Sequence, residues 1–387
     1  MALGWLVYRM TGSKLLLGTV GFLQQAPGIP LTPVAGVISD RINRRPALFL
    51  VQLGLLLQAL FLAFAIGTNR ASVPVILTLC TVQGVLNAFD LPIRQSLVPE
   101  LVSDRSDLSS AIALNSAIFN LARMIGPALG GVLVALLGEM SCIVANAASF
   151  LPILYALGLP MQLQPEAGRT KQSTILGDVA EGLRYTRAQR PFPDLLLLLA
   201  SHGLFGLSYL VLLPVLARDV LHGGPRMLGL LFAAAGGGSL LAALRLATRC
   251  NLRGLLRSIG LSSMIASVAM VLIGVVDSAP TVMLLIAAAG YGFISVSGAC
   301  NTILQTLVDD NLRGRVLSLY SLSFIAMIPL GNLLLGVLAE HLSVQHTIAL
   351  FGFLLLMSSG AYCLRLESLR KAARPIYVKR GVIPWQN

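Results

Sequence analysis

Apolar segments of about 20 residues recur along the whole chain and are separated by short polar segments. A helix of that length crosses the hydrocarbon core of a bilayer, so the pattern predicts about eleven membrane spans. In the first part of the chain these spans lie at about 15–38, 46–66, 73–95, 108–137 and 140–160. In the second part they lie at about 194–217, 228–248, 255–276, 281–305, 316–338 and 346–366. The chain is therefore predicted to be an all-α membrane protein.

Composition supports this prediction. Of the 387 residues, 56% are hydrophobic and only 11% are charged, and the mean hydropathy is +0.82. A water-soluble globule of this size carries more charge, so lipid is the expected solvent. The five cysteines contain no CxxC pair, and most lie within or at the ends of spans. They predict neither a disulfide framework nor a zinc site, and no cofactor is expected.

The net charge of +12 comes from basic residues that are distributed between the spans rather than gathered in one patch. Nucleic-acid binding is therefore not expected. If the loop after the first full span is cytoplasmic, about 22 of the 28 Lys and Arg residues lie on that side and about five lie outside. This bias predicts a protein of the plasma membrane, the inner membrane of a bacterium, with a cytoplasmic C-terminus.

The apolar stub Ala2–Val7 is too short to span a membrane and too short for a signal peptide. It is interpreted as the end of a first helix that is otherwise lost, as expected of a fragment or a truncated gene model. A helix preceding Met1 would give twelve spans and place both termini of the full-length protein in the cytoplasm.

A charged segment at 161–193 is the longest break between spans and divides the chain. If the lost helix is counted, the fourth spans of the two halves end alike. They end in Q-S-L-V at 95–98 and Q-T-L-V at 305–308, as expected of two parallel repeats. The predicted units are a truncated N-terminal helical bundle at 1–160, a cytoplasmic linker at 161–193, a C-terminal bundle at 194–366 and a basic cytoplasmic tail at 367–387.

Residues 36–45 read G-V-I-S-D-R-I-N-R-R and resemble the G-x-x-x-D-R-x-x-R-R signature of the major facilitator superfamily. Residues 126–131 read G-P-A-L-G-G and resemble the G-P-x-x-G-G signature of its proton-driven exporters, with Ala122 where a further glycine is usual. Residues 90–99 and 313–316 are similar to the branch that contains enterobactin exporters and multidrug permeases. The resemblance covers essentially the whole chain and implies two six-helix bundles, alternating access and export coupled to proton entry. The chain departs from the pattern because most of the first helix is missing and because the matching loop of the second half has basic residues without an acid.

The loop after the first full span holds the first candidate site. Gly36 lets a neighbouring helix approach closely, and Asp40 could pair with a nearby arginine or cap a helix N-terminus across the interface between the halves. Such a contact forms in one conformational state only, so it predicts a latch for the outward-facing state, as the resemblance also implies. Its predicted basic members are Arg41, Arg44 and Arg45. The alternative is that these three residues only fix the topology.

Four polar residues share one face of the third full span, because Gln83, Asn87, Asp90 and Arg94 follow at steps of four, three and four. An ionisable side chain in hydrocarbon needs a partner or water, so Asp90 is expected to pair with Arg94 or with the Asp40 loop. The latch is predicted to include Asp90 and Arg94, and the substrate cavity to include Gln83 and Asn87. The alternative for Asp90 is a static ion pair near the headgroups.

Arg123 lies about 15 residues from the start of the span at 108–137, near the middle of the bilayer. It should not face lipid, so Arg123, Asn115 and Asn120 are candidates for contacts with a polar substrate. The alternative for Arg123 is a structural cation that backbone carbonyls and the Asp90 group satisfy.

The glycines and the proline of the exporter-like signature are Gly126, Pro127, Gly130 and Gly131. They are predicted to bend the helix and to help close one side of the protein. The alternative is an ordinary packing face of small residues.

The second half offers weaker cavity or coupling candidates, which are His202, Tyr291 and Asn301. His202 could carry a proton, because an unperturbed imidazole titrates near neutrality. A single histidine in a helix is more often a packing residue, and that alternative stays open.

These features together predict a secondary transporter that exports a small amphiphilic molecule, such as a drug, a siderophore or a metabolite, in exchange for protons. It is expected to act as a monomer in the lipid bilayer. An importer of the same fold and a non-transporting sensor or scaffold remain alternatives, since the basic tail could dock a partner or anionic lipid. Enzyme activity is not expected, because the chain has no H-E-x-x-H, G-x-S-x-G or P-loop signature.

Overall fold

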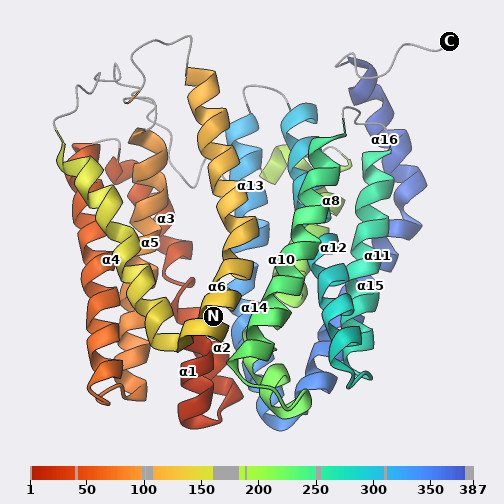
Figure 1. The fold of residues 1–387 in the computed structure, drawn as a ribbon. Coiled ribbons are helices and arrows are strands. Elements are labelled where there is room, and N and C mark those ends of the chain that lie inside the picture. Colours follow the sequence, from red (N-terminus) through yellow and green to blue (C-terminus); the bar gives the residue numbers. More distant parts are fainter. Residues whose placement is uncertain are drawn as a thin grey trace.

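The computed structural model describes residues 2–39, 42–97, 101, 108–159, 183–187, 190–249, 254–308 and 312–379. Within these ranges the chain forms helices joined by short turns, and no strand occurs (Figure 1). The predicted all-α class is therefore confirmed.

The elements of the first half are α1 (Ala2–Thr11), α2 (Lys14–Leu23), α3 (Gly28–Ser39), α4 (Arg44–Gly67), α5 (Val73–Leu97) and α6 (Leu108–Gly158). The second half begins with α8 (Phe192–Ser201), a π-helical segment (His202–Gly206), a 3-10 segment (Leu207–Leu212), α9 (Leu213–Val215) and another π-helical segment (Leu216–Val220). These pieces follow one another without a loop. The remaining elements are α10 (Pro225–Ala247), α11 (Leu255–Ile273), α12 (Ala279–Leu307), α13 (Arg313–Ile325), α14 (Met327–His341), α15 (Val344–Leu364) and α16 (Leu366–Lys379).

Nine helical spans in the described ranges are long and apolar enough to cross a membrane, and each coincides with a predicted span. The predicted span at 108–137 is the first arm of α6. Gly138, with a φ of 79°, separates this arm from the second one. Glycine adopts positive φ without the strain that a Cβ would cause, so it suits the sharp reversal between the two arms.

The predicted continuous span at 15–38 is wrong in one respect, because the structure breaks it into α2 and α3 at a turn over 24–27. Pro27 has no N–H to donate to the helix ladder. Gly28 and Ile29 donate instead to carbonyls three residues earlier, at 3.0 and 3.1 Å. The proline therefore interrupts the regular helix in the middle of this span.

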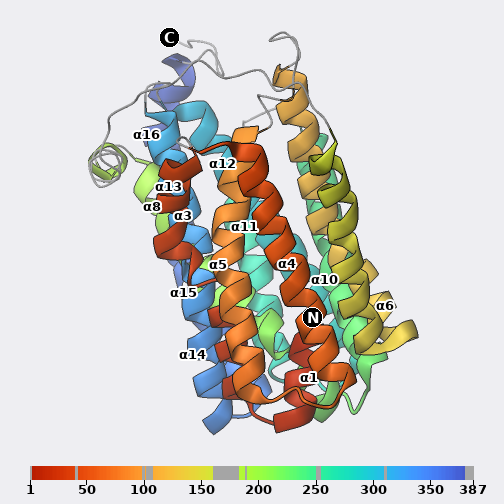
Figure 2. The same ribbon diagram turned by 90° about the vertical axis from the view of Figure 1, so that its left-hand side faces the viewer.

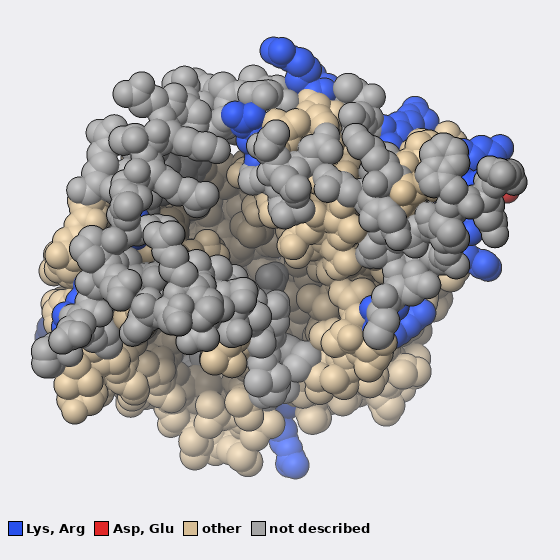
Figure 3. Space-filling model, turned by 90° about the horizontal axis from the view of Figure 1, so that it is seen from above, with Lys and Arg blue, Asp and Glu red and all other residues tan. Residues whose placement is uncertain are grey.

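The helices run between two ends of the molecule (Figures 1 and 2). The α1–α2, α4–α5 and α14–α15 turns lie at one end, which we call the outer end in keeping with the predicted topology. The start of α4 and the ends of α10 and α12 lie at the other, which we call the inner end. Seen from the inner end, the surface is hollowed near its centre (Figure 3).

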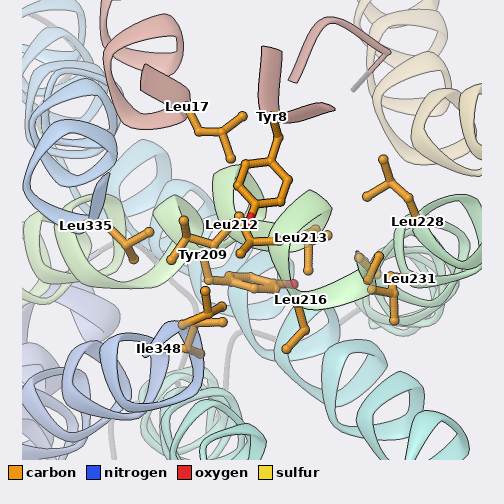
Figure 4. Close-up of a cluster of buried hydrophobic side chains, with 14 of the residues drawn as sticks. Tyr8, Leu17, Tyr209, Leu212, Leu213, Leu216, Leu228, Leu231, Leu335 and Ile348 are labelled. Carbon is orange, nitrogen blue, oxygen red and sulfur yellow. The ribbon is translucent and has the colours of Figure 1, made fainter. Parts of the chain in front are cut away.

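The largest cluster of buried apolar side chains, which we call the outer core, joins the two halves. It contains Leu6, Tyr8 and Leu17 from the first half together with Leu213 and Leu335 from the second. Figure 4 shows Tyr8 and Leu17 beside the leucines of the second half. Burial of these side chains therefore stabilises the contact between the halves near the outer end.

The inner end is organised differently, because each half has its own cluster there. The cluster of the first half contains Leu48, Ile93 and Leu157. The cluster of the second half contains Phe192 and Leu304 and extends to α16. Within the described ranges, the halves therefore share an apolar core toward the outer end and hold separate ones toward the inner end.

The predicted basic tail begins with a helix, α16, that packs on the second half. Leu369 and Ala373 are fully buried in the inner cluster of that half. Arg370, Lys371 and Arg374 lie on the exposed side of the same helix. The amphipathic pattern of α16 thus continues the helical bundle beyond the predicted boundary at 366.

Candidate functional site

An ion pair on α5 lies against the inner part of α4. The Arg94 guanidinium donates to the Asp90 carboxylate at an N–O distance of 2.7 Å. The side-chain amide of Gln52 on α4 donates to the other oxygen of this carboxylate. Gln52 is buried, and 16% of the Asp90 side chain is exposed. The structure thus contains the Asp90–Arg94 pair that the spacing predicted and adds Gln52, which sequence reasoning missed.

The basic residues at the start of α4 contact other helices of the first half. Arg44 donates to the Ser96 carbonyl at 3.1 Å, at the end of α5. Arg45 donates to the Leu157 carbonyl at 2.8 Å and to the Leu159 carbonyl, at the end of α6. Carbonyls at helix C-termini lack helical partners and favour positive charge. Two predicted latch residues therefore tie three helices of one half together in this conformation.

Gln83 and Asn87 extend the polar face of α5 away from the inner end. Gln83 is half-buried and accepts a hydrogen bond from Gln24 at 3.3 Å, at the break between α2 and α3. A Cβ on the neighbouring Gly84 would lie 2.5 Å from the Leu23 carbonyl oxygen, so α5 touches the backbone at this break. Asn87 is exposed. Gln83 is therefore bound to the interrupted helix, and Asn87 is the accessible member of the face.

Several predicted residues lie outside what the structure describes. These are Asp40 and Arg41, and the side-chain positions of Gly36, Asn115, Asn120, Arg123, Pro127 and Gly131. The backbone of α3 includes Gly36, and the backbone of α6 includes the other five. Their predicted roles stay predictions.

The structure describes only part of the exporter-like signature on α6. The backbone through it is helical, and the sharp break of the element lies at Gly138. A Cβ on Gly126 would meet no atom within 4 Å among the described residues, so this glycine makes no close contact with them. The Gly130 carbonyl, in contrast, accepts a weak hydrogen bond from Cys142 at 3.8 Å. Gly130 therefore faces the second arm of α6.

In the second half, Tyr291 of α12 lies beside Arg245 of α10. The Arg245 guanidinium donates to the Tyr291 hydroxyl and lies 5.9 Å from the centre of its ring. Asn301 accepts a hydrogen bond at 3.0 Å from the glutamine one turn later. Tyr320 of α13 donates to the Ser297 carbonyl at 3.2 Å. Arg245 and Tyr320 are polar groups beside the predicted candidates, and sequence reasoning did not count them among the site residues.

His202 begins the first π-helical segment and is fully buried. Its Nδ1 lies 2.8 Å from the Leu198 carbonyl oxygen, and the Phe293 ring stands edge-on at a centroid distance of 5.8 Å. Among the described residues, its Nε2 has no hydrogen-bond partner. The enclosure of the ring among packed helices favours the packing alternative over an open path for protons.

At the outer end, α2 and α14 meet in direct backbone contact. A Cβ on Gly18 would lie 2.8 Å from the Cα of Gly336, and a Cβ on Gly336 would lie 2.8 Å from the Cα of Gly18. We call this contact the glycine crossing. A Cβ essentially never comes so close to another carbon, so only glycine fits at either position while the helices stay together.

A polar contact beside the glycine crossing also joins the halves. The Tyr8 hydroxyl of α1 donates to the Asp219 carboxylate. The Arg218 guanidinium lies 5.5 Å from the centre of the Tyr8 ring. An aromatic ring attracts a cation over its face, so Tyr8 interacts with two oppositely charged side chains of the second half.

A family model described as a transmembrane secretion effector matches residues 1–375. The chain belongs to the transmembrane secretion effector family. Membership in this family confirms the predicted resemblance to the major facilitator superfamily. The protein is therefore a multi-pass membrane transporter of small molecules, and not an enzyme.

The relatives of this transporter include two named transport proteins. The staphyloferrin A transporter of Staphylococcus aureus (strain NCTC 8325 / PS 47) is 28% identical over 358 residues, which cover 91% of this chain and 88% of the relative. The multidrug efflux pump Tap of Mycolicibacterium fortuitum is 27% identical over 389 residues, which cover 97% and 93%.

Solved structures share the fold of the transporter. A bacterial homologue of the human lysosomal transporter Spinster, in an inward-facing and unoccupied conformation, gives a TM-score of 0.69 at 16% identity and covers 96% of this chain and 93% of that one. The inward-open xylose transporter XylE from E. coli gives a TM-score of 0.62 at 13% identity, with coverage of 92% and 86%. Identities this low show the fold alone.

Proposed function

We propose that this transporter exports a small amphiphilic molecule from the bacterial cytoplasm in exchange for protons. The observation that carries the proposal is the contrast between the shared outer core and the separate inner clusters. A transporter whose halves meet at the outer end and part at the inner end opens its cleft to the inner side, and an exporter loads its cargo in that state. The hollow at the inner end lies where such cargo would enter (Figure 3).

The kind of cargo follows from composition and from the relatives. Only 6% of the residues are aromatic and 11% are charged, which suits a weakly polar or amphiphilic molecule better than a highly charged one. One relative is named as a multidrug efflux pump and another as a transporter of staphyloferrin A. We infer that the inner end faces the cytoplasm and that one chain is the working unit.

In this proposal the Asp40 loop closes the inner end once the outer end has opened. Arg45 now contacts carbonyls of α6, and Asp90 is held by Gln52 and Arg94. These side chains would exchange partners when the inner ends of the halves meet. Replacing Asp40→Asn is expected to remove most export while the protein stays folded, because it deletes the charge of the latch. Full export by that variant would discard the inner latch.

Export is tested with inside-out membrane vesicles. A proton gradient is imposed across their membrane, and a fluorescent amphiphilic dye is added to the outside solution. Dye should accumulate in vesicles with the transporter, and a protonophore should abolish the accumulation. Empty-vector vesicles are the control. Accumulation in right-side-out vesicles instead would identify an importer, and no transport in either orientation would favour the sensor or scaffold alternative.

A further inference from the structure

The carboxylate of Glu340 connects the end of α14 to the start of α2 and thereby joins the two halves. It accepts hydrogen bonds from the backbone N–H groups of Lys14 at 2.9 Å and of Leu15 at 3.0 Å. The Ser13 hydroxyl lies at 3.4 Å from the same oxygen. The first N–H groups of a helix have no partner within the helix and carry partial positive charge. Glu340 therefore caps α2 from the opposite half.

Glu340 stands at the unfavourable end of its own helix. α14 ends at His341, and negative charge in the last turn of a helix opposes the helix dipole. α2 starts at the outer end and α14 finishes there, so the two helices run in opposite directions. The charge of Glu340 is therefore favourably placed only while the N-terminus of α2 lies beside it.

A matching sequence occurs at the other end of the same pair of spans. Residues 336–340 read G-V-L-A-E, and residues 36–40 read G-V-I-S-D. Each segment has a glycine followed four residues later by an acid, at the C-terminal end of its span. In the segment 336–340, Gly336 belongs to the glycine crossing, and Glu340, one turn later, caps the partner helix α2. Because the two spans are antiparallel, the sequence predicts the corresponding relation between Asp40 and the start of the span that contains α13 when the inner ends meet.

We infer that Glu340 is an outer latch, which stabilises the state closed to the outside and is the counterpart of Asp40 at the inner end. The inference rests on the proposed function, since it adds a second latch to alternating access. A rocking motion that separates α2 from Glu340 brings the inner ends of the same two spans together. Each acid then caps the partner helix in one of the two states. Glu340 is a positioning residue in this scheme and contacts no cargo.

The test measures the distance between the halves at the outer end. Spin labels are attached at Arg70→Cys and Arg226→Cys, two exposed positions on opposite halves, after the native cysteines have been replaced. Glu340→Gln keeps the size of the side chain and removes its charge. It is expected to raise the population with long distances about threefold to tenfold. Glu367→Gln, which removes a carboxylate from α16, is the matched control and should leave the distances unchanged.

A second pair of variants removes the donor instead of the acceptor. Lys14 is the first residue of α2, where proline is tolerated because the N–H has no helical partner. Ser13 before it is extended, with φ −87° and ψ 123°, as a residue preceding proline requires. Lys14→Pro deletes one N–H that binds Glu340 and should raise the long-distance population about twofold to threefold. Lys14→Gln loses the same ammonium group but keeps the N–H, so it should not.

The distance measurement tests the outer latch and the dye assay tests export, so either proposal can be refuted without the other. If wild-type vesicles do not export dye while Glu340→Gln still opens the outer end, the export proposal is wrong and the outer latch stands. If dye is exported while both Glu340→Gln and Lys14→Pro leave the distances unchanged, the outer latch is wrong and export stands.

Discussion

The outer and inner ends of the transporter hold their helices together by different kinds of contact. At the outer end the halves touch through backbone, with Gly18 against Gly336 and an apolar core around them. At the inner end Asp90 pairs with Arg94 within α5, and Arg45 binds carbonyls of α6. The glycine crossing has no side chain to adjust, whereas these inner contacts are made by long, charged side chains.

The outer end therefore acts as a rigid seal, whereas the inner end holds contacts that can exchange partners. Two glycine backbones in contact fit at one distance, and any added side chain pushes the helices apart. A guanidinium offers five N–H donors and can move between carboxylates and carbonyls as the helices shift. We therefore expect substitutions at the outer crossing to change the conformational state strongly, and single substitutions at Asp90, Arg94 or Arg45 to change it less.

The largest effect is expected from Gly18→Leu. The new side chain must displace the backbone of α14, and overpacking of this kind costs about 1–3 kcal/mol. That cost acts on the outward-closed state alone, so the balance should shift toward the outward-open state by roughly tenfold to a hundredfold. Dye export should fall accordingly, and spin labels at the outer end should report longer distances.

Gly237→Leu is the matched control for that experiment. Gly237 lies on α10, and a Cβ there would meet no atom within 4 Å. Export and outer distances should be those of the wild type. If Gly18→Leu behaved like this control, the glycine crossing would not be the outer seal.

A smaller effect is expected from Asp90→Asn, which leaves Arg94 and Gln52 without their anionic partner. The pair is partly exposed, with 42% of the Arg94 side chain accessible, so solvent screens much of its interaction. Export should fall about fivefold, equivalent to roughly 1 kcal/mol, if Asp90 belongs to the latch. Dye export measures the contribution of Asp90 to transport, and thermal unfolding in detergent measures its contribution to stability.

An ion pair of the other half provides the comparison for Asp90. Arg365 donates to Asp194 at 3.2 Å, near the inner end of α8. Asp194→Asn should lower the unfolding temperature by an amount similar to Asp90→Asn while export is retained. Equal losses of export in the two variants would mean that Asp90 has a structural role only.

The smallest effect is expected from Tyr291→Phe. This change removes the acceptor of the Arg245 guanidinium and keeps the ring beneath it. Arg245 is exposed, so the lost bond is replaced by water and the export rate should change less than about twofold. A loss beyond tenfold in the initial rate of dye export would show that this pair contacts the cargo.

Part of the candidate site could be predicted from spacing alone. Asp90 and Arg94 are four residues apart on one helix, so helical geometry brings them together whatever surrounds them. Gln52 belongs to another helix, and only the packing of α4 on α5 brings its amide to Asp90. The enclosure of His202 and the open space at Gly126 likewise depend on how neighbouring helices lie.

The sequence by itself determined the spans, because the length and hydrophobicity of a segment decide whether a bilayer can hold it. It also carried the family signature, which is a local pattern of residues 36–45. The tertiary structure alone decided which of the 37 glycines meet across the halves and that Glu340 caps a helix more than 300 residues away. Such contacts depend on the crossing of distant helices, and a crossing leaves no periodic signal in the residues that form it.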